Sequence, residues 1–143
     1  MIILLDTNFV VYCAKYNLFF ELEDNYAGAK FVILDNVLFE LEKIRDKKFK
    51  VTKEDIVAAN VALEYLEIKK NKGVLEVIKI KDQHDVDLMI LALAKELQEK
   101  DKNVLVATND IELSKKLIAK KIKVIKIRQK KYLMEIWLKR LIK

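Results

Sequence analysis

Short apolar runs alternate with amphipathic stretches along the whole chain. The apolar runs predict five strands, over residues 2–5, 30–34, 74–80, 103–107 and 123–127. Short, continuous apolar runs are typical of strands that are buried on both faces of a parallel sheet. We therefore expect an α/β fold, with three α/β/α layers and a central, mostly parallel five-stranded sheet.

The segments between these runs carry apolar residues at helical spacing. They predict helices from about residue 8 and over 18–24, 36–46, 52–70, 85–100, 110–120 and 130–143. Thr52 and Asp55 have the spacing of a capping box that opens the longest helix, and Gly73 suits a left-handed residue beyond its end.

Polar side chains at the predicted helix starts suggest where each helix begins. Asn8 and Asp35 follow strands and are expected to be N-caps, and Asp85 is expected to cap the helix that follows it. Each can accept a hydrogen bond from a free backbone N–H of the first turn.

Composition narrows the class of protein. The chain has 143 residues, of which 52% are hydrophobic and 35% charged, which suits a single domain over residues 1–143. No apolar run approaches the roughly 20 residues of a membrane helix, and the opening run is too short for a signal peptide, so we expect a cytoplasmic protein without a membrane partner. Cys13 is the sole cysteine, which excludes an internal disulfide and a multi-cysteine zinc site, and we expect it to be buried.

The charge balance is compatible with a nucleic-acid partner. Lys and Arg total 28 against 22 Asp and Glu, a net charge of +6, although lysine-rich surfaces are also common for solubility. Candidate RNA-binding residues lie late in the chain: Lys115, Lys116, Lys120, Lys121, Arg128, Lys130 and Lys131. Tyr132 and Trp137 are available for stacking. Trp137 shares a predicted helical stripe with Leu133, Ile136 and Leu141, which favours a core or dimer contact instead.

Two predicted strands end in the same kind of polar group. Asp6-Thr7-Asn8 follows the first strand, and Thr108-Asn109-Asp110 follows the fourth. The carboxyl ends of strands in an open α/β sheet border the crevice in which ligands bind. If the two strands are neighbours, Asp6 and Asp110 face one crevice. Asp110 also has the position of an N-cap, which is the simpler reading.

Two further acids lie on the apolar faces of predicted helices. Asp87 precedes Ile90, Leu91 and Ala94 by three, four and seven residues, which puts its carboxylate on the buried side. Glu40 lies between Val37 and Ile44 at helical spacing, although a partly buried acid near a helix start is an equally good reading.

Convergence of four carboxylates would require a cation. The acids would repel one another and take up protons unless a hard divalent ion, Mg²⁺ or Mn²⁺, bound among them. One or two such ions favour metal-assisted phosphodiester hydrolysis, which needs no histidine. The one histidine, His84, lies in a polar turn, and we expect it at the surface.

At this point four motifs, in order along the chain, resemble those of the PIN-domain family of nucleases. They are Ile3-Leu4-Leu5-Asp6-Thr7-Asn8, Leu38-Phe39-Glu40-Leu41-Glu42-Lys43, Asp87-Leu88-Met89-Ile90-Leu91-Ala92-Leu93-Ala94 and Val106-Ala107-Thr108-Asn109-Asp110-Ile111-Glu112-Leu113. One departure is Val86, where some relatives carry a further acid. The resemblance covers essentially the whole chain.

The resemblance implies a Mg²⁺- or Mn²⁺-dependent ribonuclease that prefers single-stranded RNA and often forms a homodimer. By position, Asp6, Glu40, Asp87 and Asp110 would be the catalytic and metal-binding acids, with Asn8 and Thr108 as supporting polar groups. The motifs resemble PIN proteins of ribosomal RNA processing, which implies a ribosome-assembly partner. They also resemble the toxins of toxin–antitoxin pairs, which implies an antitoxin partner.

Two other classes of function stay open. One is a non-catalytic RNA-binding or protein-interaction module on the same fold, which predicts RNA retention without turnover. The other is a phosphatase or phosphoacceptor domain, which also places an aspartate after the first strand. Asn8 breaks the D-x-D pattern of haloacid-dehalogenase-type sites, so this class is the weaker reading.

Overall fold

A six-stranded sheet forms the centre of the molecule. The computed structural model describes residues 1–48, 50–80, 85–101 and 103–137. The strands are β1 (Ile2–Leu5), β2 (Lys30–Leu34), β3 (Leu75–Ile78), β4 (Val104–Ala107), β5 (Lys123–Arg128) and β6 (Tyr132–Ile136). Their order is β3-β2-β1-β4-β5-β6. All neighbours are parallel except β5 and β6, which form an antiparallel hairpin at one edge.

The hairpin corrects the prediction for the end of the chain. Residues 132–136 form strand β6 instead of part of a helix over 130–143, so the sheet has six strands and not five. A short apolar run fits either element, and pairing decides between them, because β5 would otherwise present an open edge of backbone groups. The helical stripe proposed for Trp137 is also wrong. Trp137 directly follows strand β6, and Lys123 Nζ lies 6.0 Å from the centroid of its ring. Leu141 lies outside the described residues.

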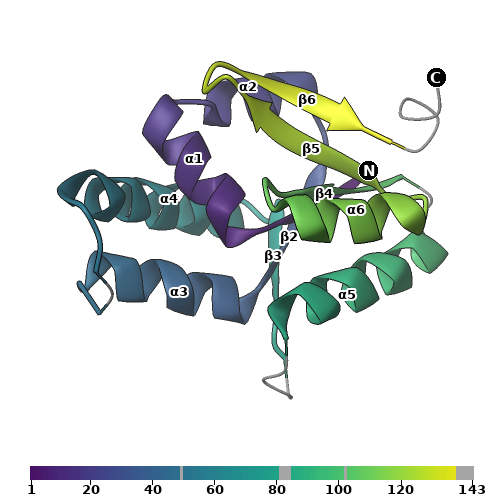
Figure 1. Cartoon of the computed structure of the whole chain (residues 1–143), viewed down its shortest axis with the longest axis horizontal. Coiled ribbons are helices and arrows are strands. Elements are labelled where there is room, and N and C mark those ends of the chain that lie inside the picture. The colour runs from purple at the N-terminus through teal and green to yellow at the C-terminus, as the bar shows by residue number, and fades with distance from the viewer. Residues whose placement is uncertain (49, 81–84, 102, 138–143) are drawn as a thin grey trace.

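Helices cover the sheet on both sides. They are α1 (Thr7–Tyr16), α2 (Phe19–Asn25), α3 (Asp35–Arg45), α4 (Lys53–Asn71), α5 (Val86–Lys100) and α6 (Ile111–Ala119). Helix α4 packs against α1 and α3, and α5 packs against α6, so that the strands separate the two groups (Figure 1). The predicted three-layer α/β/α arrangement is confirmed.

Local sequence signals account for several helix ends. Thr52 and Asp55 form the predicted capping box at the start of α4, with reciprocal hydrogen bonds of 3.1 and 3.2 Å. Asp85 caps α5 by accepting from the backbone of Asp87. Gly73 has a φ of 75°, the left-handed conformation expected beyond the end of α4.

Two predicted caps are wrong, for the same physical reason. Helix α1 begins at Thr7, and its N-cap is Asp6, not Asn8. Asp35 is the first residue of α3, and its Oδ1 accepts from the backbone N of Ile80 at 3.4 Å instead of capping its own helix. In both places a partner from a distant segment binds the side chain that local sequence assigns to a cap.

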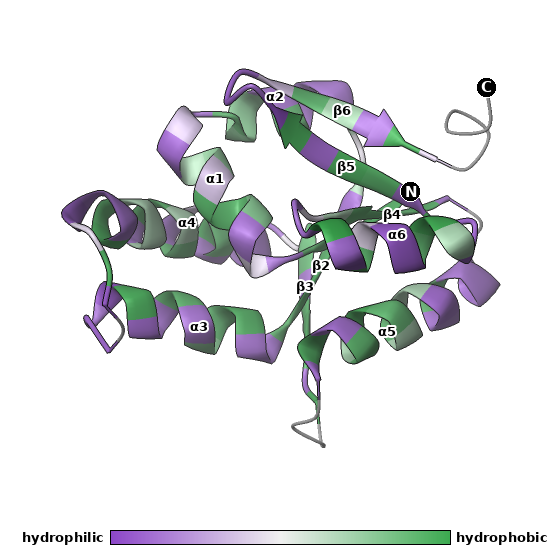
Figure 2. Ribbon diagram, viewed as in Figure 1, coloured by the Kyte–Doolittle hydropathy of each residue, from purple (hydrophilic) through white to green (hydrophobic). Residues whose placement is uncertain are grey.

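The core lies between the sheet and both helical layers. Figure 2 shows hydrophobic residues through the strands and along one side of the helices. The largest fully buried side chains are Phe9, Ile3, Leu4, Leu5, Leu22, Ile33, Leu34, Leu41, Leu66, Ile90, Leu113 and Leu117. Cys13 is also fully buried, as predicted. In the part of the chain that the structure describes, no helix has the length and apolar character needed to span a bilayer.

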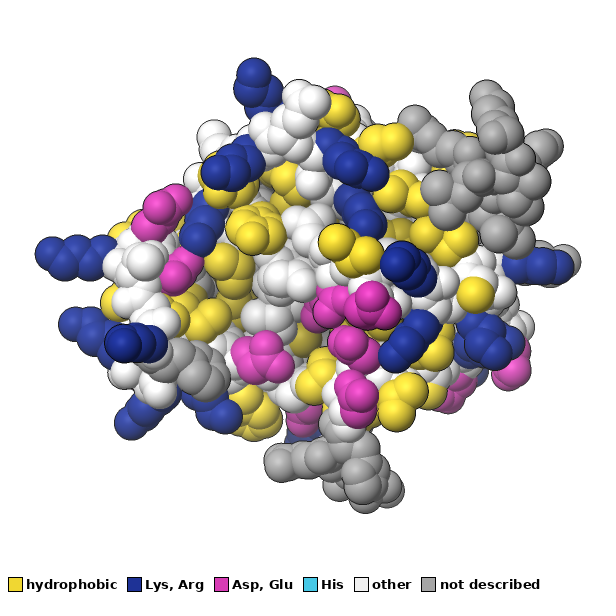
Figure 3. Space-filling view, in the orientation of Figure 1, with side chains coloured by type: hydrophobic (Ala, Val, Ile, Leu, Met, Phe, Trp, Pro, Cys, Tyr) yellow, Lys and Arg dark blue, Asp and Glu magenta, His cyan; other side chains and the backbone are white. Residues whose placement is uncertain are grey.

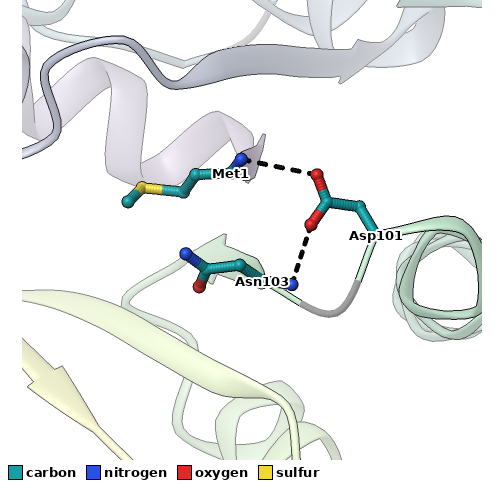
Figure 4. A network of polar contacts seen from close by, with 3 residues as sticks. All are labelled: Met1, Asp101 and Asn103. Carbon is teal, nitrogen blue, oxygen red and sulfur yellow. Dashed lines mark hydrogen bonds and ion pairs between the residues drawn. The ribbon is translucent and has the colours of Figure 1, made fainter.

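Polar contacts join the amino ends of the two central strands. The Met1 ammonium lies 3.4 Å from Asp101 Oδ2, and Asp101 Oδ1 accepts from the backbone N of Asn103 at 2.9 Å (Figure 4). Ile2 N donates to Asn103 O at 2.9 Å. The backbone bond aligns β1 with β4, and this alignment determines which residues meet at the opposite ends of the two strands. The ion pair itself is exposed to solvent and contributes little to stability.

Candidate active site

The site begins where β1 and β4 end side by side. Leu5 pairs with Ala107, so the residues that follow, Asp6 and Thr108, leave the sheet at the same level. Asp6 N donates to Ala107 O at 3.0 Å and extends this alignment beyond the strands. The chain builds β2 and β3 on one side of β1 and β4 on the other, which makes this strand end the switch point of the sheet.

Asp6 is held by two hydrogen bonds and is only 8% exposed. Its Oδ1 accepts from Thr7 N at 2.9 Å, and its Oδ2 accepts from Thr108 Oγ1 at 2.7 Å. Thr108 is fully buried, and its Oγ1 accepts in turn from Asp110 N at 3.1 Å. One hydroxyl therefore connects the acid after β1 to the segment that carries the acid after β4.

Asp110 combines the two roles that the sequence left open. Its Oδ1 accepts from Leu113 N at 2.9 Å, so it is the N-cap of α6, and its side chain also lines the cavity described below. Asn8 supports this loop, because its Oδ1 accepts from Asn109 N at 3.1 Å. Asn109 Oδ1 accepts from Ile127 N at 2.9 Å and ties the loop to β5.

All four predicted acids line one open cavity of about 430 Å³. Asp6 follows β1, Glu40 comes from α3, Asp87 from α5 and Asp110 precedes α6. Figure 3 shows acidic side chains gathered near the middle of this face, with lysines and arginines around them. The rest of the lining consists of Thr7, Asn8, Val11, Tyr12, Lys15, Ile44, Val51, Asp55 and Val86.

The acids perturb one another electrostatically. Burial is the main cause that raises the pKa of Asp6; the hydrogen bonds from Thr108 and Thr7 oppose it, and the charges of Asp87 and Glu40 add to it. The pKa of Asp87 is raised by burial, and by the charges of Asp110 and Asp85. Both shifts are in the direction expected when like charges share a cavity without a counter-ion.

The donor set suits a hard divalent cation. Carboxylate oxygens are the ligands that Mg²⁺ and Mn²⁺ prefer, and a bound cation would offset the repulsion among the acids. Thr7 also lines this cavity, and its Oγ1 is buried with no hydrogen-bond partner among the described residues. Within those same residues, no three Asp, Glu, His or Cys side chains form a group that could hold a metal as they stand. The residues thus fit such an ion by their chemistry, and their role as ligands stays a prediction.

Sequence reasoning missed three residues at this cavity. Lys15 and Tyr12 come from α1, and Asp55 comes from the first turn of α4. Lys15 Nζ lies 2.5 Å from Asp55 Oδ1, and this carboxylate raises the pKa of Lys15. Helical spacing carried a signal, because Lys15 lies four and eight residues after Val11 and Thr7 on one face of α1. This spacing can be used for a prediction only when Asp6 is known to be the N-cap of α1.

The predicted RNA-binding residues are exposed and do not line the cavity. Lys115 and Lys116 are exposed on α6, Arg128 is exposed at the end of β5, and Lys130 and Lys131 are exposed in the turn before β6. His84, predicted to be at the surface, lies outside the described residues.

Comparison with known proteins identifies the family. The pattern of the PIN-like domain matches residues 3–130, which is most of the chain. The chain belongs to the PIN-domain nuclease family. The resemblance found in the four motifs is therefore confirmed.

Relatives agree in sequence and in fold. The chain is 39% identical over 130 residues to Ribonuclease VapC4 of Methanocaldococcus jannaschii, a match that covers 89% of this chain and 90% of that protein. The PIN domain endonuclease Utp24 has a similar structure, with a TM-score of 0.64 and 24% identity over 94% of this chain and 90% of Utp24. A domain of a functionally unknown protein from Methanocaldococcus jannaschii has a TM-score of 0.61 and 19% identity, over 94% of this chain and 96% of that one. The two structural matches show the shared fold.

Proposed function

We propose that this PIN-domain nuclease is a metal-dependent endoribonuclease that hydrolyses phosphodiester bonds of single-stranded RNA in the acidic cavity. The observation that carries the proposal is that four carboxylates from separate parts of the chain line one cavity at the switch point of the sheet. The 39% identity to a protein named as a ribonuclease supports RNA as the substrate.

In this proposal Asp6, Glu40, Asp87 and Asp110 hold one or two Mg²⁺ or Mn²⁺ ions. A divalent ion, when bound, polarises the phosphoryl oxygen and lowers the pKa of its water. The same four side chains repel the RNA phosphates while no cation is present. The acids therefore make substrate binding at the cavity dependent on the ion.

Thr108 and Asn8 position the acids. The Thr108 hydroxyl donates to Asp6, which favours the charged form of a carboxyl whose pKa burial raises. Asn8 anchors the backbone of Asn109, next to Asp110. Both contacts hold the carboxylates before a ligand arrives, so fewer groups must be ordered in the reaction.

Cleavage of a labelled single-stranded RNA tests the proposal. The wild-type protein is assayed with Mn²⁺ or Mg²⁺, then with excess EDTA, and the Asp6→Asn variant is assayed with the metal. Asp24→Asn is the matched control, because Asp24 is an exposed acid on α2, away from the cavity lining. We expect activity in the wild type and in the control, and loss of activity with EDTA and with Asp6→Asn. Cleavage that survives both the chelator and the substitution refutes the proposal.

Metal binding has a test that does not depend on turnover. A ligand that binds only the folded state raises the melting temperature by mass action. Mn²⁺ is therefore expected to raise the melting temperature of the wild type and of Asp24→Asn, and to raise that of Asp6→Asn by less. An equal rise in all three proteins contradicts metal binding at Asp6.

A second candidate function is a non-catalytic RNA-binding module. One observation favours it, namely that no three acidic side chains of the described residues are grouped closely enough to hold a metal as they stand. It predicts RNA retention that EDTA does not alter, with no cleavage at any concentration of Mn²⁺. The cleavage assay separates the two functions directly.

For the biological setting we propose a toxin ribonuclease with an antitoxin partner. The match to Ribonuclease VapC4 supports this setting over ribosomal RNA processing with a ribosome-assembly partner. Induced expression is then expected to arrest growth, and co-expression of the partner to relieve the arrest. Accumulation of unprocessed ribosomal RNA on depletion of the protein would instead indicate the processing role. The homodimer also stays a proposal, which light scattering of the purified protein tests.

A further inference from the structure

Helix α1 carries a strip of tyrosines and lysines that leads out of the acidic cavity. Tyr12 lines the cavity and is 37% exposed, and its ring stacks on Tyr16 with centroids 5.9 Å apart and planes at 23°. Lys15 Nζ lies 5.8 Å from the centroid of Tyr12, and Lys130 Nζ lies 5.6 Å from that of Tyr16. We call these four residues the α1 strip.

The strip has a direction along the surface. Helix α1 begins at Thr7, directly after Asp6, and ends at Tyr16. At a rise of about 1.5 Å per residue, Tyr16 lies about 6 Å along the helix beyond Tyr12, which lines the cavity. Lys130, in the turn between β5 and β6, extends the strip at its far end. Figure 3 shows basic and hydrophobic side chains close together over α1 and the nearby hairpin, beside the acidic group.

Tyr12 differs from the tyrosines with a structural task, whereas Tyr16 is partly buried and packs against the core. The hydroxyls of Tyr26 and Tyr65 are half-buried or buried and donate to Glu135 and Glu23 at 2.9 and 3.0 Å. The Tyr12 hydroxyl makes no such contact within the described part of the chain. Its exposed ring thus lies at the mouth of the cavity without an evident role in stability.

We propose that the α1 strip binds the segment of single-stranded RNA that flanks the scissile bond. Bases of the segment stack on Tyr12 and Tyr16, and its phosphates lie near Lys15 and Lys130. The part of this inference that places the scissile bond in the cavity rests on the proposed function. Of the four residues, only Lys130 was among the RNA-binding candidates named from the sequence.

The chemistry of the strip matches this ligand. Aromatic rings stack on any base, and lysines along the same path follow the backbone, which is the usual arrangement for single strands bound without sequence preference. Lys15 is already held by Asp55, so it loses little freedom when a phosphate arrives. Lys130 also attracts the RNA towards a cavity whose acids would otherwise repel it, whereas the charge of Lys15 is balanced by Asp55.

The strip is tested by RNA binding in protein that carries Asp6→Asn, so that the RNA stays intact. The probe is a fluorescein-labelled single-stranded RNA of twelve nucleotides, followed by anisotropy. Tyr12→Leu and Tyr16→Leu are each expected to weaken binding about fivefold or more. Lys130→Gln is expected to reduce the slope of log K against log salt concentration by about 0.7. An RNA duplex of equal length is expected to bind less tightly, since its bases are not free to stack.

Two control variants remove the same chemical groups elsewhere. Phe20→Leu removes a ring that is 78% exposed on α2, and Lys100→Gln removes an exposed charge at the end of α5. Both are expected to bind the single strand with nearly the parent affinity. If the control variants lose as much affinity as the strip variants, the loss is a general effect of removing a ring or a charge, and the proposed role of the α1 strip is overturned.

The remaining outcomes are also decisive. Unchanged affinity in Tyr12→Leu and Lys130→Gln overturns the proposal, as does a parent protein that binds no single-stranded RNA. Lys130 lies in an exposed turn, so its substitution serves even if Tyr16→Leu lowers stability. If the strip variants weaken RNA binding but the wild type never cleaves RNA, the proposed function is refuted and the α1 strip still stands as an RNA-binding surface. Cleavage by the wild type, with binding insensitive to the strip variants, refutes the strip alone.

Discussion

Replacement of Thr108 by valine tests the central contact of the candidate site. Valine has nearly the shape of threonine, so the fully buried position stays filled. The substitution removes the hydroxyl that donates to Asp6 Oδ2 at 2.7 Å and accepts from Asp110 N at 3.1 Å. Its effect therefore reports on hydrogen bonding rather than on packing.

The size of the loss follows from the two bonds. A hydrogen bond to a charged group contributes about 1.5–3 kcal/mol, and one between neutral groups about 0.5–1.5 kcal/mol. The gain from a buried methyl in place of the hydroxyl offsets about 1 kcal/mol. The net loss is about 1–3.5 kcal/mol, which lowers the melting temperature by roughly 3–12 °C for a chain of this length.

The loss should depend on pH, and its sign follows from Asp6. In the wild type, burial raises the pKa of Asp6 and the Thr108 hydrogen bond partly opposes this rise. Without that bond the pKa of Asp6 rises further, because the charged form has lost a donor. The destabilisation is therefore largest at about pH 8 and shrinks as the pH falls through the pKa of Asp6, where the carboxyl takes up a proton.

Thermal and urea unfolding in EDTA measure this effect, since a bound metal would itself alter the pKa. Thr108→Ser is the matched control, because it keeps the hydroxyl and loses only a methyl group. We expect about 1 kcal/mol of destabilisation for serine, nearly independent of pH. Refutation would come from a valine variant as stable as the wild type, or from equal and pH-independent losses in both variants.

Two further predictions concern other ionisable side chains. Asp87→Asn is expected to stabilise the metal-free protein by up to about 1 kcal/mol near pH 7, because burial and the neighbouring acids raise the pKa of Asp87 in the folded state. Urea unfolding should show this gain disappear as the pH falls and Asp87 takes up a proton in the wild type, and a destabilised variant near pH 7 would contradict the sign. Cys13 is fully buried, and burial raises the pKa of its thiol, so the folded protein should not react with a thiol reagent that modifies it fully in denaturant. Equally fast modification in both states would show that the Cys13 environment is open.

Local signals were sufficient where a contact lies within a few residues. The capping box of Thr52 and Asp55, the cap at Asp85 and the left-handed Gly73 are each determined by neighbours in sequence. Apolar runs likewise predicted five of the six strands, because a strand buried on both faces has a nearly continuous run of apolar residues. Chemistry that depends on residue type, such as four acids in a recognisable order, was readable as well.

Predictions failed where a distant partner competed for the same group. Tyr132–Ile136 is a strand because it pairs with the edge of β5. The sequence of residues 132–136 alone does not indicate this pairing. Asn8 and Asp35 have the residue types of caps, but backbone groups of Asn109 and Ile80 bind their side chains instead. Local propensity is weak beside such contacts, so the tertiary fold decides.

Except for the strand at the end of the chain, the order of the elements was readable from the sequence, as were the acids at the strand ends and the family to which the chain belongs. The tertiary structure brings these acids together, because β1 and β4 are far apart in sequence and become neighbours through the topology of the sheet. It also decided that one buried hydroxyl, that of Thr108, connects Asp6 to the backbone of Asp110. The physical reason is that a carboxylate taken out of water requires donors, and here Thr7 from its own helix and Thr108 from the neighbouring strand end supply them.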